Sequence, residues 1–272
     1  MSPSSCAATA AGRSNADNED SHFRNDDLRL YMVADGLGGY AGGATASRVV
    51  TKMLPEYLCA RLHILSDGIE GAVRATGAPA ATIEGLAAVL RDTLPAGARG
   101  VKECLLAGAR QTHQEVQRWS ASDPRFKGMR TTLCLLYLAE NDFWFLNVGD
   151  NRGYLIRDKS ILQITEDHTP AFRLYKEGVI AKEDIHLQQD ADVLTQAVGS
   201  SRPIAPDVFQ GNSRPGDMFL LCTDGITKEL PDKEILEAFV SSPVPGGVAQ
   251  KLMALAVQRG ARDDATVVVV WR

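Results

Sequence analysis

The sequence predicts an α+β fold with an antiparallel sheet, and the chain is long enough for a two-layer sheet core with helices outside. The chain has 272 residues, of which 44% are hydrophobic, so it can bury the core of one large domain. Short β-like segments separated by turn residues occupy 131–164. Stretches with apolar residues three and four positions apart lie on both sides of that region and predict helices.

The N-terminal part is predicted to hold one buried strand and several helices. Residues 1–11 are rich in Ser and Ala, and we expect them to be frayed. The apolar run 28–34 predicts a buried strand. Pro55 is expected to bend or break the first helix. The helices are expected over 43–58, around 83–94 and over 101–119.

The middle of the chain is predicted to form an antiparallel meander. The polar stretch 165–191 follows it and lacks a strong core face, which is typical of a surface flap. The meander strands are expected at 131–138, 143–148, 153–157 and 160–164. Beyond the flap, strands are expected at 218–223 and 267–271, and helices at 232–239 and 247–259, with Gly260 ending the last helix.

Charge and hydropathy exclude several classes of protein. A net charge of −5 argues against a general binder of nucleic acid or anionic membranes. No apolar run approaches the ~18–20 residues of a membrane helix, and the N-terminus lacks the pattern of a signal peptide. We therefore expect a cytoplasmic protein without a membrane or nucleic-acid partner. The 5 cysteines are scattered without metal-ligand spacing and are expected to be reduced thiols.

Acidic clusters flank the predicted buried strands. An Asp-Gly pair ends two of these strands, and the first pair opens a turn in which glycines predominate. A glycine-rich turn before a helix would explain one such pair, but its repetition favours a site. Converging carboxylates are costly unless a cation neutralises them, which indicates Mg²⁺ or Mn²⁺ bound through oxygen. The clusters are Asn18–Asp20, Asp35–Gly36, Asp224–Gly225 and Asp263–Asp264.

Taken together, these motifs resemble those of the metal-dependent protein phosphatases, the PPM family or type 2C serine/threonine phosphatases, particularly the single-domain bacterial members. They run in the family's order along almost the whole chain. The matching segments are Gly12…Asn18-Glu19-Asp20-Ser21, Val33-Ala34-Asp35-Gly36-Leu37-Gly38-Gly39…Gly42-Gly43…Ala46-Ser47, Thr131-Thr132-Leu133, Asn147-Val148-Gly149-Asp150-Asn151-Arg152-Gly153, Thr165…Asp167-His168-Thr169, Gly216-Asp217…Leu220-Leu221-Cys222-Thr223-Asp224-Gly225 and Gly260…Asp263-Asp264-Ala265-Thr266-Val267.

The resemblance implies a fold and a set of site residues. Residues 1–272 would form one phosphatase catalytic domain, a four-layer α-β-β-α sandwich of two antiparallel sheets flanked by helices, with a metal site at one edge. Asp35 would bridge two ions, Asp20 would orient metal-bound water, and Asp150 would help to hold a third, weaker ion. The implied metal ligands are the carboxylates of Glu19, Asp35, Asp224 and Asp263 and the carbonyl of Gly36.

The implied activity is hydrolysis of phosphoserine and phosphothreonine in proteins, with Asp35, Asp224 and Asp20 as the catalytic acids. Two Mn²⁺ or Mg²⁺ ions roughly 3.5–4 Å apart can bridge a water, lower its pKa to give hydroxide, and bind the phosphoryl oxygens for direct attack. No covalent phosphoenzyme is required. This agrees with the lack of an anion-binding loop around Cys104 or Cys134.

Two positions depart from the family pattern. Asn15 stands where the family has an arginine that binds the substrate phosphate, which should weaken binding unless the nearby Arg13 reaches the phosphate. Leu37 stands where eukaryotic members have a general-acid histidine. His168 belongs to the flap motif, and we interpret it as structural rather than as a replacement acid.

Three hypotheses follow for the function. The first is a metal-dependent serine/threonine protein phosphatase that opposes a Ser/Thr kinase by acting on phosphorylated proteins, expected to be a monomer. The second is a catalytically weak pseudophosphatase that binds phosphoproteins as a regulatory module, and Asn15 is its only support. The third is a phosphatase for small phosphorylated molecules. Phosphate release separates the second from the others, because a binding module would not turn over its ligand.

Overall fold

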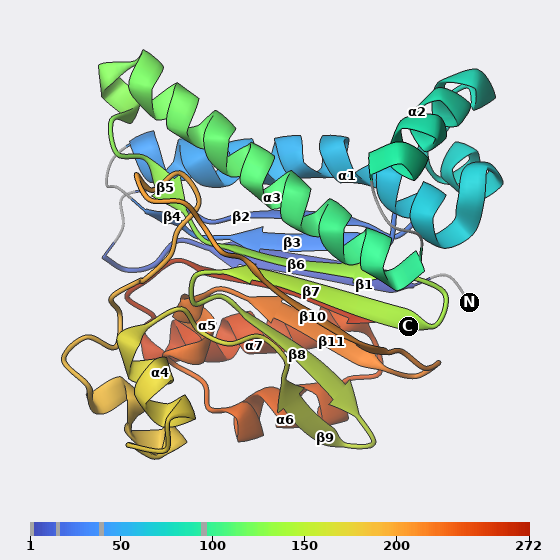
Figure 1. The fold of residues 1–272 in the computed structure, drawn as a ribbon. Helices are drawn as coiled ribbons and strands as arrows, with labels where there is room; N and C mark the ends of the chain where they lie inside the picture. The colour runs from blue at the N-terminus through green and yellow to red at the C-terminus, as the bar shows by residue number, and fades with distance from the viewer. Residues whose placement is uncertain (1–2, 15–16, 38–40, 94–96) are drawn as a thin grey trace.

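The computed structural model describes residues 3–14, 17–37, 41–93 and 97–272. In this part of the chain two five-stranded antiparallel sheets stack between layers of helices, which confirms the predicted α-β-β-α arrangement (Figure 1). The first sheet holds, in spatial order, β10 (Asp207–Asn212), β7 (Asp142–Val148), β6 (Leu133–Leu138), β3 (Leu30–Ala34) and β2 (Ser21–Asn25). The second holds β1 (Ser4–Ala10), β12 (Ala265–Trp271), β11 (Met218–Cys222), β8 (Arg152–Arg157) and β9 (Ser160–Gln163). A short ladder pairs β4 (Gly36–Leu37) with β5 (Arg130–Thr131).

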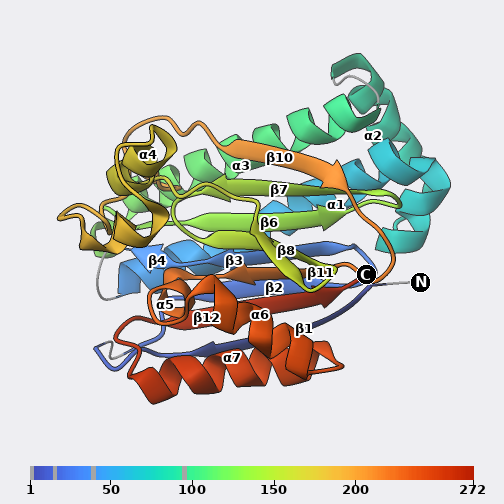
Figure 2. The same cartoon turned by 90° about the horizontal axis from the view of Figure 1, so that it is seen from below.

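Helices lie on the outer face of each sheet, as Figures 1 and 2 show from two directions. Over the first sheet lie α1 (Ala41–Thr76) and α3 (Gly97–Ser122), with α2 (Ala80–Thr93) packed on α1. Over the second lie α5 (Asp224–Thr227), α6 (Asp232–Ser241) and α7 (Pro245–Arg259). The remaining helical elements are η1 (Pro124–Phe126), α4 (Pro170–Lys176) and η2 (Lys182–Leu187). No helix in the described ranges is long and apolar enough to cross a membrane.

The central strands are apolar on both faces because both faces are covered. In β3, Leu30 and Met32 pack toward the helices, whereas Tyr31 and Val33 pack toward the other sheet. In β12, alternate valines divide in the same way between the core under α6 and α7 and the core between the sheets. This explains why these segments appear in the sequence as continuous apolar runs rather than alternating ones.

The expected fraying of residues 1–11 is wrong for the described residues from Ser4 onward. Ser4–Ala10 forms β1, which pairs antiparallel with β12 along its full length. Cys6, Ala8 and Ala10 also pack on the core beneath the second sheet. Small Ser and Ala side chains have low strand propensity, but pairing with a valine-rich neighbour and one-sided burial override it here.

The meander also differs from the prediction, because its strands belong to two sheets. β6 and β7 pair within the first sheet, whereas β8 and β9 pair within the second. The chain crosses between the sheets in the segment Gly149–Asn151. This crossing places Asp150 at the edge where both sheets end, and it is the reason that a continuous meander could not form.

The first helix is longer than predicted. Pro55 lies inside α1 and does not end it, and the marked departure from helical geometry is at Gly68, with φ 73°. Leu54, Leu58 and Leu62 continue one buried face across the proline. Burial of that face compensates for the hydrogen bond that proline cannot donate. α7 ends as predicted, with Gly260 in the left-handed conformation at φ 84°.

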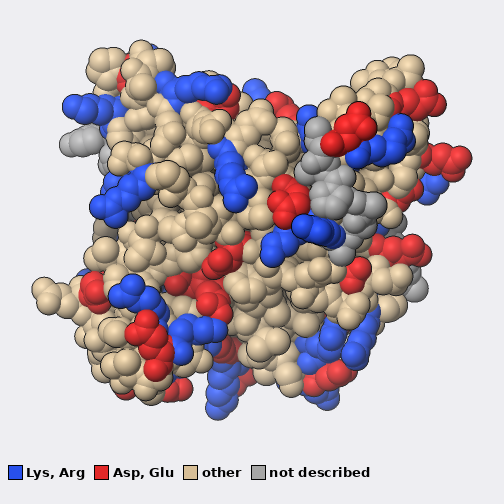
Figure 3. All heavy atoms as spheres, in the orientation of Figure 1, with Lys and Arg blue, Asp and Glu red and all other residues tan. Residues whose placement is uncertain are grey.

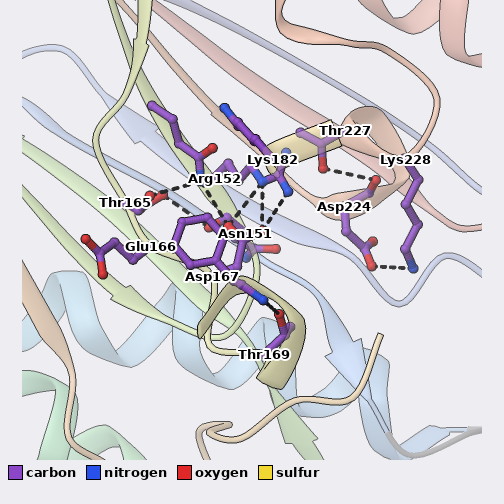
Figure 4. Close-up of polar contacts among 12 residues, drawn as sticks. Asn151, Arg152, Thr165, Glu166, Asp167, Thr169, Lys182, Asp224, Thr227 and Lys228 are labelled. Carbon is purple, nitrogen blue, oxygen red and sulfur yellow. Dashed lines mark hydrogen bonds and ion pairs between the residues drawn. The ribbon is translucent and has the colours of Figure 1, made fainter. Parts of the chain in front are cut away.

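The predicted flap leaves the second sheet after β9 and forms a small packed unit of its own. Thr169 caps α4 by accepting a hydrogen bond from the N–H of Phe172 at 3.1 Å. Phe172 and Ile185 form a separate hydrophobic cluster with Ala171. Arg152 of β8 holds the base of the flap through Asp167, with Nη2 2.7 Å from Oδ2 (Figure 4).

Candidate active site

Acidic side chains from distant parts of the sequence surround one pocket where strands of both sheets end. The pocket has a volume of about 390 Å³. Figure 3 shows one face of the molecule, on which acidic and basic side chains lie close to one another. The described residues that line it include seven acids, one lysine and the Gly36 backbone. The acids are Glu19, Asp35, Asp150, Asp192, Asp224, Asp263 and Asp264.

Asp35 follows β3 and is held there by Thr131 at the end of β5 and by Thr132, which lies between β5 and β6. Its N–H donates to Thr132 Oγ1 at 2.9 Å, and its carbonyl accepts from Thr131 Oγ1 at 2.6 Å and from the Thr132 N–H at 2.9 Å. The residue is only 7% exposed. Because its backbone is fixed on both sides, its carboxylate is presented to the pocket by the rigid part of the sheet.

Gly36 allows three chain segments to meet beside Asp35. A Cβ on Gly36 would lie 2.6 Å from the carbonyl oxygen of Glu19 and closer still to the carbonyl of Gly43. Any larger residue would therefore push apart the backbones that carry Glu19 and the start of α1. The glycine-rich motif thus meets a requirement for close approach of backbone to backbone.

Asp264 is buried beside the site and connects two of its loops through hydrogen bonds. It is 2% exposed, and its two oxygens accept from the N–H groups of Gly12 at 2.8 Å and Glu19 at 2.7 Å. It therefore ties the loop that carries Glu19 to the loop before β12. Its neighbour Asp263 has a side chain 42% exposed at the pocket.

Asp20 lies beside the pocket rather than in its lining. Its Oδ2 accepts from Thr223 Oγ1 at 2.8 Å, while its buried Oδ1 has no hydrogen-bond partner. Thr223 Oγ1 also accepts from the Thr266 N–H at 2.9 Å. The acid is thus connected to Thr223, which lies between β11 and Asp224, and through Thr223 to Thr266 of β12.

Asp150 is positioned by the crossing between the sheets. Gly149 before it has φ 109°, and a Cβ there would lie 2.6 Å from Thr132 Cγ2. His168 of the flap base accepts from the Gly149 N–H through Nδ1 at 3.1 Å, and its Nε2 lies 3.0 Å from Asp207 Oδ2. Both ring nitrogens are thus used to hold the turn, which agrees with the structural role predicted for His168.

The carboxylates strongly perturb one another. Burial and the Asp224 charge are the main causes that raise the pKa of Asp35 well above its usual range. Burial, augmented by Asp224 and Asp264, raises the pKa of Asp20 to about 7 despite hydrogen bonds from Thr266 and Thr223. Burial and then Asp264 raise the pKa of Glu19. Such clustering of acids is unfavourable without a compensating positive charge.

The donor set fits divalent metal ions of the hard class. Asp20 Oδ1 and Asp224 Oδ1 are buried without a hydrogen-bond partner, and the carboxylates share one cavity. Among the described residues, no three acidic, histidine or cysteine side chains converge into a tight ligand cluster. Mg²⁺ and similar ions keep several waters and need few protein oxygens each, so a roomy pocket with dispersed acids suits them.

The structure places Arg13, one of the two predicted phosphate-binding residues, outside the pocket lining. Arg13 is not part of the described pocket lining, and its guanidinium lies against Gly260 at the end of α7. Asn15 lies outside the described residues. Six predicted residues do meet at the pocket: Glu19, Asp35, Gly36, Asp150, Asp224 and Asp263.

Sequence reasoning missed Lys228 and Asp192. Lys228 follows Asp224 by four residues, so the helical spacing of the pair was a signal for it. Asp192 comes from the flap end, and no local pattern marks its approach to the pocket.

A family model described as protein phosphatase 2C matches residues 8–252, most of the chain. The chain belongs to the protein phosphatase 2C family. This confirms the predicted family, and the acidic pocket lies where the motifs that carry the resemblance meet.

Proteins named as serine/threonine phosphatases are similar to this chain over nearly its whole length. The serine/threonine protein phosphatase PstP of Mycobacterium tuberculosis is 32% identical over 263 residues, which cover 97% of this chain and 44% of PstP. The chain therefore spans less than half the length of PstP. The serine/threonine phosphatase stp of Listeria monocytogenes is 29% identical over 267 residues, covering 97% of this chain and 94% of stp.

Solved structures show the same fold. The catalytic domain of PstP in complex with two manganese ions has a TM-score of 0.74 and 30% identity, over 99% of this chain and 98% of that domain. The likeness covers both sheets and their helices. It confirms the predicted four-layer architecture of the phosphatase 2C chain.

Proposed function

We propose that this chain is a metal-dependent serine/threonine protein phosphatase. The observation that carries the proposal is the meeting of Glu19, Asp35, Asp150, Asp224 and Asp263 around one pocket of about 390 Å³. Burial and then their mutual repulsion raise the pKa of several of them, and a bound cation would remove that repulsion. Membership of the protein phosphatase 2C family and the names of the relatives support the same activity.

The residues that would hold the ions are those of the pocket wall. Glu19, Asp35, Asp224 and Asp263 would supply carboxylate oxygens, and Gly36 would supply its carbonyl. The complex of the PstP catalytic domain with two manganese ions supports two Mn²⁺ or Mg²⁺ ions. When bound, such ions supply an activated water and neutralise charge on the transferred phosphoryl group.

Hydrogen bonds from neighbouring residues fix the geometry of that site. Thr131 and Thr132 fix the Asp35 backbone, and Asp264 fixes Glu19. Asp20, hydrogen-bonded to Thr223, lies where it can accept a proton beside the pocket. In the metal-free protein, burial raises the pKa of Asp20 to about 7.

A second cavity supports a protein rather than a small-molecule substrate. It has a volume of about 600 Å³ and shares Asp150, Asp224 and Lys228 with the first pocket. Its other walls come from the flap, including Lys182 and Ile185, and from the segment that leads into α6. A peptide chain could lie there while its phosphorylated side chain enters the acidic pocket. The cellular role would then be to oppose a serine/threonine kinase.

The test is release of phosphate from a phosphothreonine peptide with Mn²⁺, with Mg²⁺ and with EDTA. We expect turnover that depends on added metal and that is abolished in Asp35→Ala and Asp224→Ala, while both variants stay folded because removing one carboxylate relieves repulsion. Asp27→Ala, which changes an exposed aspartate in the turn between β2 and β3, is the control and should keep full activity. Retained turnover in the purified Asp35→Ala or Asp224→Ala variant would refute the metal assignment.

The alternative of a pseudophosphatase has no support in the comparisons. It rests on Asn15, which lies outside the described residues. A folded protein that binds the phosphopeptide but releases no phosphate with either metal would favour it. Asn15→Arg would then be the first variant to make, since a restored arginine should lower KM or restore turnover if position 15 contacts the phosphate.

A further inference from the structure

Lys228 places a positive charge inside the acidic cluster. Its Nζ lies 2.6 Å from Asp224 Oδ2, 3.2 Å from Asp192 Oδ1 and 3.5 Å from Asp263 Oδ2. Figure 4 shows the side chain turned toward Asp224. Among the described residues that line the acidic pocket, Lys228 is the one with a cationic side chain. An ammonium surrounded by three carboxylates occupies a position that a metal ion would otherwise suit.

The backbone fixes this arrangement. Asp224 begins α5 and Lys228 caps its end, and the Lys228 N–H donates to the Asp224 carbonyl at 2.8 Å. One helical turn therefore sets the Asp224 and Lys228 side chains side by side. The Lys228 side chain is 39% exposed and that of Asp224 is 11% exposed, so the ion pair lies at the wall of the pocket and not in open solvent.

The same wall holds Asp150, which the family resemblance implied as a ligand of a third ion. Asp150, the candidate ligand for that ion, lines both cavities, as do Asp192, Asp224 and Lys228. The ammonium partly offsets the rise in pKa that burial and Asp224 impose on Asp150. A divalent ion at this wall would face a lysine charge held within a few ångströms, so the residues present do not fit a third ion.

We propose that the Lys228 ammonium takes the place of a third divalent ion and serves as a permanent, non-exchangeable cation on this side of the pocket. This inference rests on the metal site of the proposed function. Lys228 acts as a positioning residue, because it orients the Asp224 carboxylate. The two exchangeable ions would be held by Glu19, Asp35, Asp224 and Asp263, with the ammonium on the Asp192 side of Asp224.

The test measures metal binding, not turnover. Equilibrium dialysis with Mn²⁺ should give two ions per chain for the wild-type protein and for Lys228→Arg, which keeps the charge. Lys228→Met and Lys228→Asp should each bind one ion more, with tighter binding in Lys228→Asp because it adds a ligand. Lys233→Met is the matched control, since Lys233 lines the neighbouring cavity but not the acidic pocket, and it should bind two.

Thermal unfolding separates this role from a merely structural one. In EDTA, Lys228→Met should have a lower Tm than the wild-type protein, and Mn²⁺ should restore most of the difference. A deficit of the same size with and without Mn²⁺ would overturn the inference. Three ions in the wild-type protein, or two in both Lys228→Met and Lys228→Asp, would also overturn it while leaving the proposed function intact. No Mn²⁺ binding by the wild-type protein would instead refute the metal site itself.

Discussion

Asp263 and Asp264 are adjacent in the sequence but have different surroundings. The Asp263 side chain is 42% exposed at the pocket, whereas Asp264 is 2% exposed and accepts the N–H groups of Gly12 and Glu19. The first is suited to bind an ion and the second to hold the loops in place. The two adjacent aspartates of this motif therefore have different roles, one in binding an ion and the other in positioning loops.

We expect Asp264→Asn and Asp263→Asn to separate these two roles. Asp264→Asn turns one acceptor into a donor that faces a buried N–H, which should lower the free energy of unfolding by about 1–3 kcal/mol. Asp263→Asn should leave stability in EDTA unchanged or slightly raised, but should weaken Mn²⁺ binding. Urea unfolding and Mn²⁺ titration of both variants measure the two effects. Equal stability losses in the two variants would contradict this assignment.

At the scale of residues, sequence reasoning could identify the acids but not all of their neighbours. Glu19, Asp35, Asp224 and Asp263 lie in local motifs next to strands, so their convergence could be predicted. The position of Arg13 depends on how the first loop packs against the end of α7, which no local pattern encodes. Asp192 likewise reaches the pocket only through the path of the flap.

Among the elements, the junction of β4 with the start of α1 is the tightest part of the site. The backbones of Gly43 and Glu19 approach Gly36 so closely that they leave no room for a side chain on Gly36. By contrast, a Cβ on Gly42 would meet nothing nearer than Met129 Cβ at 3.5 Å, an ordinary contact. Neighbouring glycines of one motif thus differ in their structural requirement.

Gly36→Ala should therefore be damaging and Gly42→Ala should be tolerated. The first forces two backbones apart, at a cost of on the order of 1–3 kcal/mol, and displaces Glu19 from the pocket. The second adds an alanine to a helix, which is neutral or stabilising by up to ~1 kcal/mol. Chemical denaturation and metal-dependent phosphate release should show loss of both properties in Gly36→Ala only. A fully active Gly36→Ala protein would show that the junction is not rigid.

Elements were predicted best where one pattern dominated. The buried strands that became β3, β11 and β12 are apolar on both faces, and the sequence marks them clearly. β1 was missed because Ser and Ala carry little strand signal, and its stability comes from pairing with β12. The division of the meander between two sheets depends on long-range packing, which the turn residues Gly149–Asn151 do not reveal.

For the molecule as a whole, the acidic cluster links stability to pH. In the metal-free protein, burial and neighbouring acids raise the pKa of Asp20 to about 7, and the pKa values of Asp35 and Asp150 also rise. Unfolded aspartates titrate at about 4, so between about pH 4 and 7 the folded state binds more protons than the unfolded state. Stability from this cluster is therefore present at the acidic end and decreases as pH rises.

We expect the Tm in EDTA to be higher at about pH 5.5 than at about pH 7.5, by several degrees. Each unit of pKa shift corresponds to ~1.4 kcal/mol, and each kcal/mol shifts Tm by about 2–4 °C in a protein of this size. Mn²⁺ should reverse the trend, because metal ions replace the protons. Calorimetry across this range with EDTA and with Mn²⁺ measures the difference. The Asp35→Asn variant, which lacks one titrating group, should show a smaller slope in EDTA, and an identical slope would contradict this explanation.

The pairing of β1 with β12 has a consequence for the order in which the protein can be made. β1 is synthesised before Ala265–Trp271, which is its only ladder partner among the described strands. Contacts between such distant segments form slowly, because the entropy cost of closing a long loop comes before the favourable energy of the contacts. The loop that carries Asp263 and Asp264 is also synthesised late. A nascent chain therefore cannot complete the acidic pocket before β12 has been synthesised, and we expect the proposed phosphatase activity only after that point.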